Sequence, residues 1–258
     1  MPTPKRTSKP TPSNALHAMR AVQGSAAAIL CAAGVSSRMG GVKKEYLPLG
    51  ASSLTVLGCA FAAFAVCARI ERVVIAVPPG SEEEARASLP EELAGTQGRL
   101  LFTPGGPTRR ASVHNALSLL EPYKPSHVLI HDGARPWVTP CLIEKIIDAA
   151  VQFGAAIPAL TLQETPKELE PGDGDYCGPV FIKRHLKRAR LCAAQTPQGF
   201  RFPEILSAHE KAAKREAQEH VEYTDDAEVW GEFIGQVAVI PGDPANRKIT
   251  YPGDMAHP

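Results

Sequence analysis

An apolar run that ends in a small-residue turn with nearby cations is the clearest chemical feature of this sequence. The run at 27–31 leads into Ala32, Ala33 and Gly34, and Arg38 and Lys44 follow. Glycine lets a backbone come close to a ligand, and the two cations can bind phosphate oxygens. Neither the Gly-Lys-Ser/Thr ending of a Walker loop nor the three-glycine dinucleotide fingerprint is present. The segment predicts a polyphosphate site, with a plain turn carrying two solvated cations as the alternative.

Two further loops carry polar residues after expected strands. The Gly-rich loop 105–112 enters a helix, where backbone N–H groups could meet a base or phosphate, although a plain turn and helix start is equally simple. At 131–136, Asp132 stands at a strand end beside Gly133 and Arg135. Its carboxylate could hold a ribose hydroxyl, a substrate hydroxyl or Mg²⁺, whereas the simpler alternative is a loop ion pair with Arg135. His131 is expected to be a packed, orienting residue and not a base.

A late set of polar segments completes the candidates. It comprises 195–198, 224–225 and 246–250. Each is ordinary by itself, because Thr224 could be only a helix cap and Lys248 only a surface charge. Their order along the chain, after the earlier loops, is what makes them informative.

The elements that must position these loops alternate between strands and helices. Strands are expected at 27–31, 73–77, 100–102, 128–130 and 237–240, and helices at 54–68, 110–120, 140–153, 202–217 and from 224. Ser81 and Glu84 predict a capping box, and Thr139 a cap. The alternation predicts an α/β, Rossmann-like and mostly parallel sheet with helices on both faces. Ligands bind such sheets at the carboxyl ends of strands, so the loops at 32–34 and 131–135 can face one ligand.

The segment 160–190 interrupts this pattern with Pro, Gly and acidic residues between short extended runs. It predicts a hairpin arm that leaves the sheet.

The 258 residues otherwise suit one large domain, expected over 25–258. Residues 1–24 hold four bases, no acid and many Pro, Ser and Thr, so we expect a disordered tail, with Met19 as a candidate start of translation. The composition of this tail also imitates a transit peptide.

Charge and cysteine usage narrow the class of protein. The formal net charge is +1, and beyond the tail 24 bases face 27 acids, which offers no basic face for nucleic acid. No uncharged apolar run approaches the length of a membrane span. The six cysteines form no close pair of the kind that binds zinc, so we expect mostly small core residues in a reducing, cytoplasmic compartment. They are Cys31, Cys59, Cys67, Cys141, Cys177 and Cys192.

The ordered set of motifs resembles the 2-C-methyl-D-erythritol 4-phosphate cytidylyltransferase family of the non-mevalonate isoprenoid pathway. The motifs run from about residue 26 to 254 as Leu-x-Ala-Ala-Gly-x-x-x-Arg-Met, Lys-x-Tyr-Leu, Gly-Gly-x-x-Arg-x-x-Ser, His-Asp-Gly-Ala-Arg-Pro, Thr-Pro-Gln, Thr-Asp and Lys-Ile-Thr. The resemblance implies that CMP passes from CTP to 2-C-methyl-D-erythritol 4-phosphate with release of pyrophosphate. It also implies Mg²⁺, bound mainly through the CTP phosphates, with no dedicated protein metal site.

The resemblance also implies roles for individual residues. Arg38, Lys44 and Lys248 match the catalytic cations. The positions around the nucleotide are Ala32, Ala33, Gly34, Gly106, Ser112 and Gly133. The positions facing the sugar phosphate are Asp132, Arg135, Thr165, Arg188, Thr196 and Thr224. Of these, Thr165 and Arg188 match arm positions that the family contributes across a dimer interface, so the arm is expected to dimerise the protein.

The sequence departs from the family at three places. Lys43 and Glu45 replace the usual Pro and Gln beside Lys44, and Pro107 replaces an Asp near the base. The family normally continues beyond the position of Pro258 into a terminal helix, which leaves open how the Lys248 loop is supported. The alternatives are a cytidylyltransferase for another polyol phosphate, such as ribitol 5-phosphate, and a non-catalytic nucleotide-binding or scaffolding protein.

Overall fold

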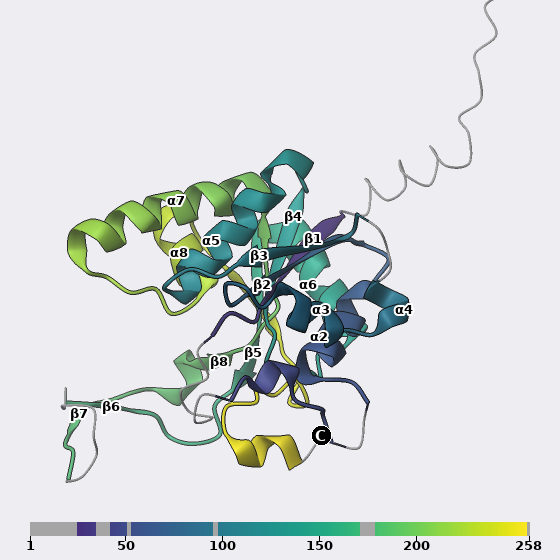
Figure 1. Cartoon of the computed structure of the whole chain (residues 1–258). Helices are drawn as coiled ribbons and strands as arrows, with labels where there is room; N and C mark the ends of the chain where they lie inside the picture. Colours follow the sequence, from purple (N-terminus) through teal and green to yellow (C-terminus); the bar gives the residue numbers. More distant parts are fainter. Residues whose placement is uncertain (1–24, 35–41, 51–52, 95–97, 171–178, 257–258) are drawn as a thin grey trace, which may run out of the picture.

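An eight-stranded sheet forms the centre of the molecule (Figure 1). The computed structural model describes residues 25–34, 42–50, 53–94, 98–170 and 179–256. The expectations about the tail and Met19, together with Arg38 and Cys177, fall outside these ranges. The strands are β1 Ala26–Cys31, β2 Ile70–Val77, β3 Leu100–Pro104, β4 His127–Asp132, β5 Ala155–Thr161, β8 Cys192–Ala194, β9 Gln198–Arg201 and β10 Ala238–Pro241.

The sheet has the order β10-β5-β9-β4-β1-β2-β3, with β8 paired to β5. The neighbours β1, β2, β3 and β4 run parallel, as do β5 and β10. Strand β9 lies antiparallel between β4 and β5, and β8 is antiparallel to β5. The predicted mostly parallel α/β sheet is confirmed, and β9 is an insertion of opposite direction that the alternation did not predict.

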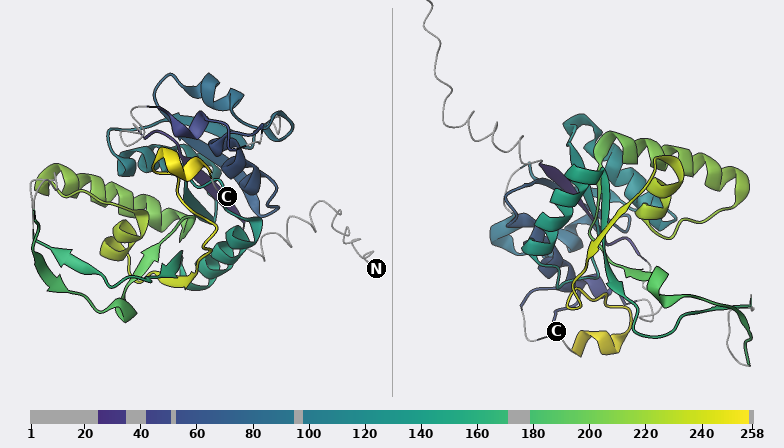
Figure 2. Two further views of the ribbon diagram at one scale, coloured as in Figure 1. Left: turned by 90° about the horizontal axis from the view of Figure 1, so that it is seen from below. Right: turned by 180° about the vertical axis from the view of Figure 1, so that it is seen from behind.

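Helices cover both faces of this sheet (Figures 1 and 2). One face carries α2 Val56–Ala65, α3 Glu82–Ala87, α4 Glu91–Ala94 and α6 Pro140–Phe153. The other face carries α5 Arg109–Leu120, α7 Phe202–Glu219 and α8 Asp226–Phe233. Strand β1 is apolar along its length because alternate residues pack into different cores, Leu30 on the α2 side and Ile29 on the α5 side.

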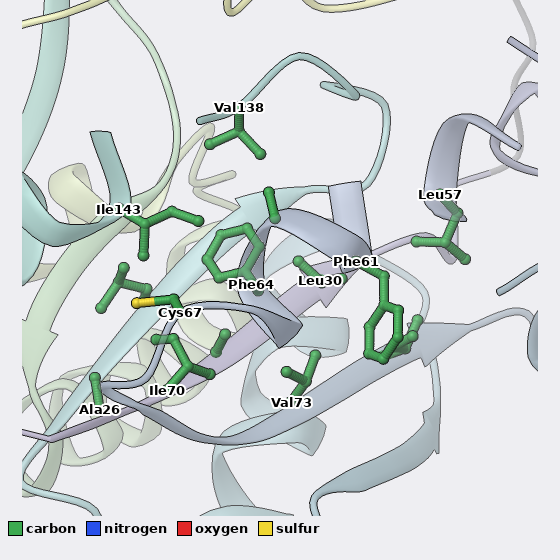
Figure 3. Packing of buried hydrophobic residues seen from close by; sticks show 14 of the residues in the cluster. Ala26, Leu30, Leu57, Phe61, Phe64, Cys67, Ile70, Val73, Val138 and Ile143 are labelled. Atoms are coloured by element: carbon green, nitrogen blue, oxygen red, sulfur yellow. The ribbon is translucent and has the colours of Figure 1, made fainter. Parts of the chain in front are cut away.

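The core on the α2 side is built around two phenylalanines of that helix. Phe61 and Phe64 are both almost fully buried and pack with Leu30 and Ile70 of the sheet (Figure 3). Burial of an aromatic or branched side chain of this kind contributes roughly 1.5–3 kcal/mol. This packing fixes β1 against α2.

Local capping signals are confirmed in one helix and fail in another. Thr139 accepts from the N–H of Leu142 at 3.3 Å, and α6 ends at Gly154 with a φ of 86°. Ser81 precedes α3, but its side chain makes no capping hydrogen bond. Its hydroxyl instead accepts from Nζ of Lys43 at 2.9 Å. The predicted capping box is therefore wrong, because the backbone of Ser81, with φ of −104° and ψ of 15°, lacks the extended conformation of an N-cap residue.

The expected arm is present as a second, two-stranded sheet. Strand β6 Lys167–Leu169 pairs antiparallel with β7 Ile182–His185, and the pair projects from the body (Figures 1 and 2). This agrees with the hairpin predicted within 160–190.

The cysteines agree with expectation only in part. Of the five within the described ranges, Cys67 is buried, Cys31 and Cys59 are partly buried, and Cys141 and Cys192 are exposed, so the prediction of core cysteines fails for these last two. Cys141 lies in the first turn of α6 and Cys192 lies on the short strand β8. At both positions the side chain points away from the core, although nearby residues in the sequence are apolar. Within the described ranges, no helix is both long and apolar enough to cross a membrane.

Candidate active site

The loops that follow β1 and β4 lie side by side at the carboxyl edge of the sheet. Cys31 and Asp132 are partners in the parallel register, and the N–H of Gly133 donates to the carbonyl of Cys31 at 2.9 Å. A Cβ atom at position 133 would lie 3.1 Å from that carbonyl oxygen, so the close approach favours glycine. The loops that contain Gly34 and Asp132 can therefore face one ligand, as predicted.

The Gly-rich loop after β3 packs against the same edge. A Cβ atom at Gly105 would lie 2.2 Å from that of Ala33, which leaves room only for glycine. The N–H of Gly106 donates to Oγ of Ser112 at 3.0 Å, and that hydroxyl is also 3.0 Å from the carbonyl of Thr108, to which it donates. The side chain of Ser112 thus bonds to both Gly106 and Thr108 and holds the backbone of this loop in place.

Asp132 stands at the centre of a cluster of cations. Its Oδ2 lies 2.9 Å from Nζ of Lys248 and 3.6 Å from Nε of Arg135, and its Oδ1 lies 3.7 Å from Nε of Arg109. Burial alone would raise the pKa of this carboxyl, but Lys248, Arg109 and Arg135 outweigh that effect and hold the pKa well below its usual range. The side chain of Asp132 is therefore ionised at neutral pH, and it lies at the carboxyl edge of the sheet.

A buried histidine and threonine orient Asp132 from behind. The hydroxyl of Thr196 accepts from the N–H of Asp132 at 3.1 Å and lies 3.0 Å from Nδ1 of His131. The side chain of His131 is fully buried and packs against Phe64, with ring centroids 5.1 Å apart and an angle of 53° between the ring planes. Its expected role as a packed, orienting residue is confirmed.

Hydrogen bonds answer the question of how the Lys248 loop is supported. Arg135 donates through Nη1 to the carbonyl of Asn246 at 2.8 Å, and Gln195 donates to the same carbonyl at 3.1 Å. The side chain of Asn246 is fully buried and donates to the carbonyl of Thr196 at 2.7 Å. These bonds join the loops after β4, β8 and β10, so the Lys248 loop is anchored within the described chain.

Lys44 lies on the short helix η2 Lys44–Tyr46 and is half-buried. The C-terminal helix η5 Pro252–Ala256 carries Asp254, whose Oδ2 accepts from the N–H groups of Thr250 and Tyr251 at 2.7 and 2.8 Å. These two N–H groups lower the pKa of Asp254, and the charges of Arg247 and Lys44 lower it further. The segment that follows Lys248 is therefore held in its turn by the Asp254 carboxylate.

Comparison with known proteins places the chain in a family. Residues 26–258 match the family model of IspD, 2-C-methyl-D-erythritol 4-phosphate cytidylyltransferase. The chain belongs to this family. The 2-C-methyl-D-erythritol 4-phosphate cytidylyltransferase of Pelotomaculum thermopropionicum is 37% identical over 231 residues, which cover 89% of this chain and 90% of that relative.

Two further IspD relatives extend the comparison. The bifunctional enzyme IspD/IspF of Bradyrhizobium sp. (strain ORS 278) is 42% identical over 231 residues, 89% of this chain and 54% of that protein. The chain thus spans about half the length of the bifunctional relatives it matches. The crystal structure of the cytidylyltransferase from Thermus thermophilus superposes with a TM-score of 0.66 at 30% identity, covering 88% of this chain and 94% of that one.

Three residues assigned by resemblance to the sugar phosphate make only local contacts among the hydrogen bonds of the described residues. The hydroxyl of Thr224 is exposed and donates to Glu228 at 3.0 Å, at the start of α8. Thr165 is exposed between β5 and β6, and Arg188 on η4 Arg188–Arg190 donates to the carbonyl of Gln163. Thr165 and Arg188 thus belong to the base of the arm, and their contact with a substrate stays a prediction.

Arg109 and Asp226 are two residues of this site to which the sequence motifs assigned no role. Arg109 contacts Asp132 on one side, and on the other its Nη1 lies 2.8 Å from Oδ2 of Asp226, which is 1% exposed. A cation in the first turn of a helix is opposed by the helix dipole. Arg109 opens α5 in this way, and that local mismatch was the signal that it has a partner elsewhere.

Proposed function

We propose that the protein transfers CMP from CTP to 2-C-methyl-D-erythritol 4-phosphate and releases pyrophosphate. The observation that carries the proposal is the meeting of small-residue loops with the Asp132 and Lys248 pair at one edge of the sheet. This edge belongs to a chain that matches the IspD family model over residues 26–258. Small-residue loops suit a triphosphate, and a carboxylate beside cations suits a phosphorylated polyol.

In this reaction an oxygen of the acceptor phosphate attacks the α-phosphorus of CTP. The bond from that phosphorus to the bridging oxygen breaks, and the electron pair leaves with pyrophosphate. The protein need supply only position and charge, because the acceptor is itself the nucleophile. We assign Arg38, Lys44 and Lys248 to the charge that develops on the phosphates.

The nucleotide and the acceptor divide the remaining residues between them. We assign the backbone at Ala32, Ala33, Gly34, Gly106 and Gly133, with Ser112, to the nucleotide. We assign Asp132, Arg135, Thr196 and Thr224 to the acceptor. For Thr196, which is 5% exposed and whose hydroxyl is bonded to His131 and Asp132, the proposed contribution is to hold Asp132 in place.

Magnesium is proposed to enter with the CTP phosphates. Among the described residues no three His, Cys, Asp or Glu side chains gather so as to hold a metal ion. Asp132 offers oxygen ligands, but its carboxylate already faces three cations. Mg²⁺ commonly binds through substrate phosphates and water with few protein ligands, so the residues present fit an ion of that kind.

We further propose a cytoplasmic homodimer in which the arm of one protomer reaches the site of the other. The arm exposes apolar side chains, with Phe181 73% and Ile182 49% exposed. Exposed apolar patches of this kind indicate interaction surfaces. Thr165 and Arg188 lie at the base of the arm and would then complete the acceptor site from the partner.

The state of the cysteines supports the proposed cytoplasmic location. The five described cysteines are free, as is usual in a reducing compartment.

Pyrophosphate release tests the activity directly. The purified chain is given CTP and Mg²⁺ with 2-C-methyl-D-erythritol 4-phosphate, ribitol 5-phosphate or no acceptor. The proposal expects release that depends on 2-C-methyl-D-erythritol 4-phosphate. Turnover with ribitol 5-phosphate alone would replace the acceptor, and CTP binding without turnover would favour a non-catalytic nucleotide-binding protein.

A further inference from the structure

The guanidinium of Arg109 lies between two carboxylates. Its Nη1 is 2.8 Å from Oδ2 of Asp226, and its Nε is 3.7 Å from Oδ1 of Asp132. The side chains of Asp226 and Asp132 are 1% and 13% exposed, so both contacts are largely shielded from water. A planar guanidinium can address two carboxylates along different edges, which a lysine ammonium cannot do in the same way.

Asp226 is held in place by a buried neighbour on the side away from Arg109. It is the first residue of α8, and its Oδ1 lies 3.3 Å from Nε2 of His209, a fully buried residue of α7. Each oxygen of Asp226 therefore has its own neighbour, His209 on one side and Arg109 on the other. Burial raises the pKa of Asp226, but Arg109 and then His209 outweigh it, so the pKa lies below its usual range and the carboxyl stays charged.

The two oxygens of Asp132 have different surroundings as a result. Oδ2 faces Lys248 at 2.9 Å and Arg135 at 3.6 Å, whereas Oδ1 faces Arg109. The distance of 3.7 Å from Nε of Arg109 is longer than a hydrogen bond, whereas Nη1 of the same guanidinium lies 2.8 Å from Asp226. Oδ1 thus remains able to accept a hydrogen bond from a ligand. Without Asp226, Arg109 would close on Oδ1 and take that place.

We propose that Arg109 and Asp226 are a positioning pair that keeps Oδ1 of Asp132 available to a hydroxyl of the acceptor. The proposal rests on the proposed function, because it assigns Asp132 to the acceptor. Asp226 also follows Thr224 by two residues, so the pair joins two segments assigned to the acceptor. Neither residue of the pair needs to touch the nucleotide.

The test compares Asp226→Asn with a matched control. Arg110, the next residue of α5, pairs with Glu216 of α7 at 2.5 Å, and both side chains are largely buried. Glu216→Gln removes a similar ion pair that does not contact Asp132. Steady-state pyrophosphate release is measured while CTP and the acceptor are varied separately. We expect Asp226→Asn to raise the KM for the acceptor about tenfold, as a coupling of typical size would. The KM for CTP should stay within about twofold, and Glu216→Gln should change neither KM.

A second set of variants keeps the test decisive if Asp226→Asn does not fold. Arg109→Lys keeps the positive charge but replaces the planar guanidinium, which can contact two carboxylates at once, with an ammonium. The double variant Arg109→Met with Asp226→Asn leaves neither member of the pair charged. Arg109→Lys should raise the acceptor KM selectively. The double variant has no guanidinium left to close on Oδ1 of Asp132, so its acceptor KM should return toward that of the wild type. An unchanged acceptor KM in Arg109→Lys, an equal rise for CTP, or a double variant as impaired as Arg109→Lys would overturn the proposal. If the wild-type chain itself released no pyrophosphate with either acceptor, the proposed function would fail, which is a different result.

Discussion

The hydroxyl of Thr196 lies 3.0 Å from Nδ1 of His131 and donates its hydrogen to that nitrogen. The other nitrogen, Nε2, is 3.1 Å from the carbonyl of Arg135, which can only accept. Nε2 must therefore carry the hydrogen, and Nδ1 accepts from Thr196. The same threonine oxygen accepts from the N–H of Asp132, so a neutral His131 is part of what orients Asp132.

Neutral His131 predicts a loss of stability in mild acid. Burial lowers the pKa of His131 from 6.5 to about 4, so between these values the unfolded chain binds a proton that the folded chain does not. This stabilisation is present above pH 6.5 and is lost as the pH falls toward 4. It amounts to at most about 1.4 kcal/mol for each pH unit. Urea unfolding at several pH values between about 7 and about 4.5 measures it.

The comparison variant is His131→Asn, whose side chain cannot become charged. It should be less stable at neutral pH, because packing against Phe64 is lost, but its stability should depend less on pH. His127 also has a pKa lowered by burial, and it titrates in both proteins, so the difference between the two profiles isolates His131. Parallel profiles would contradict the assignment.

Two neighbouring lysines should behave differently when replaced. We expect Lys44→Ala to reduce turnover about 10²–10³-fold, as removal of a transition-state charge stabiliser does. Lys43→Ala breaks a 2.9 Å bond to Ser81 and a 3.7 Å ion pair with Glu84 that is largely exposed. Exposed pairs contribute at most about 1 kcal/mol, so this variant should keep most of its activity. Pyrophosphate release and thermal melting, measured for both, separate catalysis from stability.

Disruption of the arm should separate the protomers. Phe181→Glu places a charge on a side chain that is 73% exposed next to β7, and we expect a monomer by light scattering after size exclusion, with loss of activity. Phe153→Glu, at the end of α6 and 55% exposed, is the matched control and should leave the assembly unchanged. A wild-type chain that is monomeric and fully active would show that the arm contributes nothing across an interface.

The cysteines should react with thiol reagents in an order set by their surroundings. Burial raises the pKa of Cys31 to about 12 and that of Cys67 to about 11, so both remain protonated in mildly alkaline buffer. Cys141 and Cys192 are exposed. Iodoacetamide followed by peptide mass spectrometry should find Cys141 and Cys192 modified first. Rapid modification of Cys31 in the folded protein would mean that the carboxyl end of β1 is more open than described.

Local signals in the sequence determined the order and type of most elements. The apolar runs that predict β1, β2 and β4 are the strands themselves, and Thr139 caps the helix that follows it directly. Such signals can be recognised without knowledge of the fold. The motif order also determined the family, and the strand ends determined which edge of the sheet holds the site.

Only the tertiary structure decided how the charged residues pair. Ser81 was predicted to cap a helix but binds Lys43, and Arg109, which received no role from the sequence, joins Asp132 to Asp226. These partners lie far apart in the chain and on different elements, so no local pattern records them. Ion pairs depend on distance and burial, and both are set only when β9 enters the sheet and the helices pack against it.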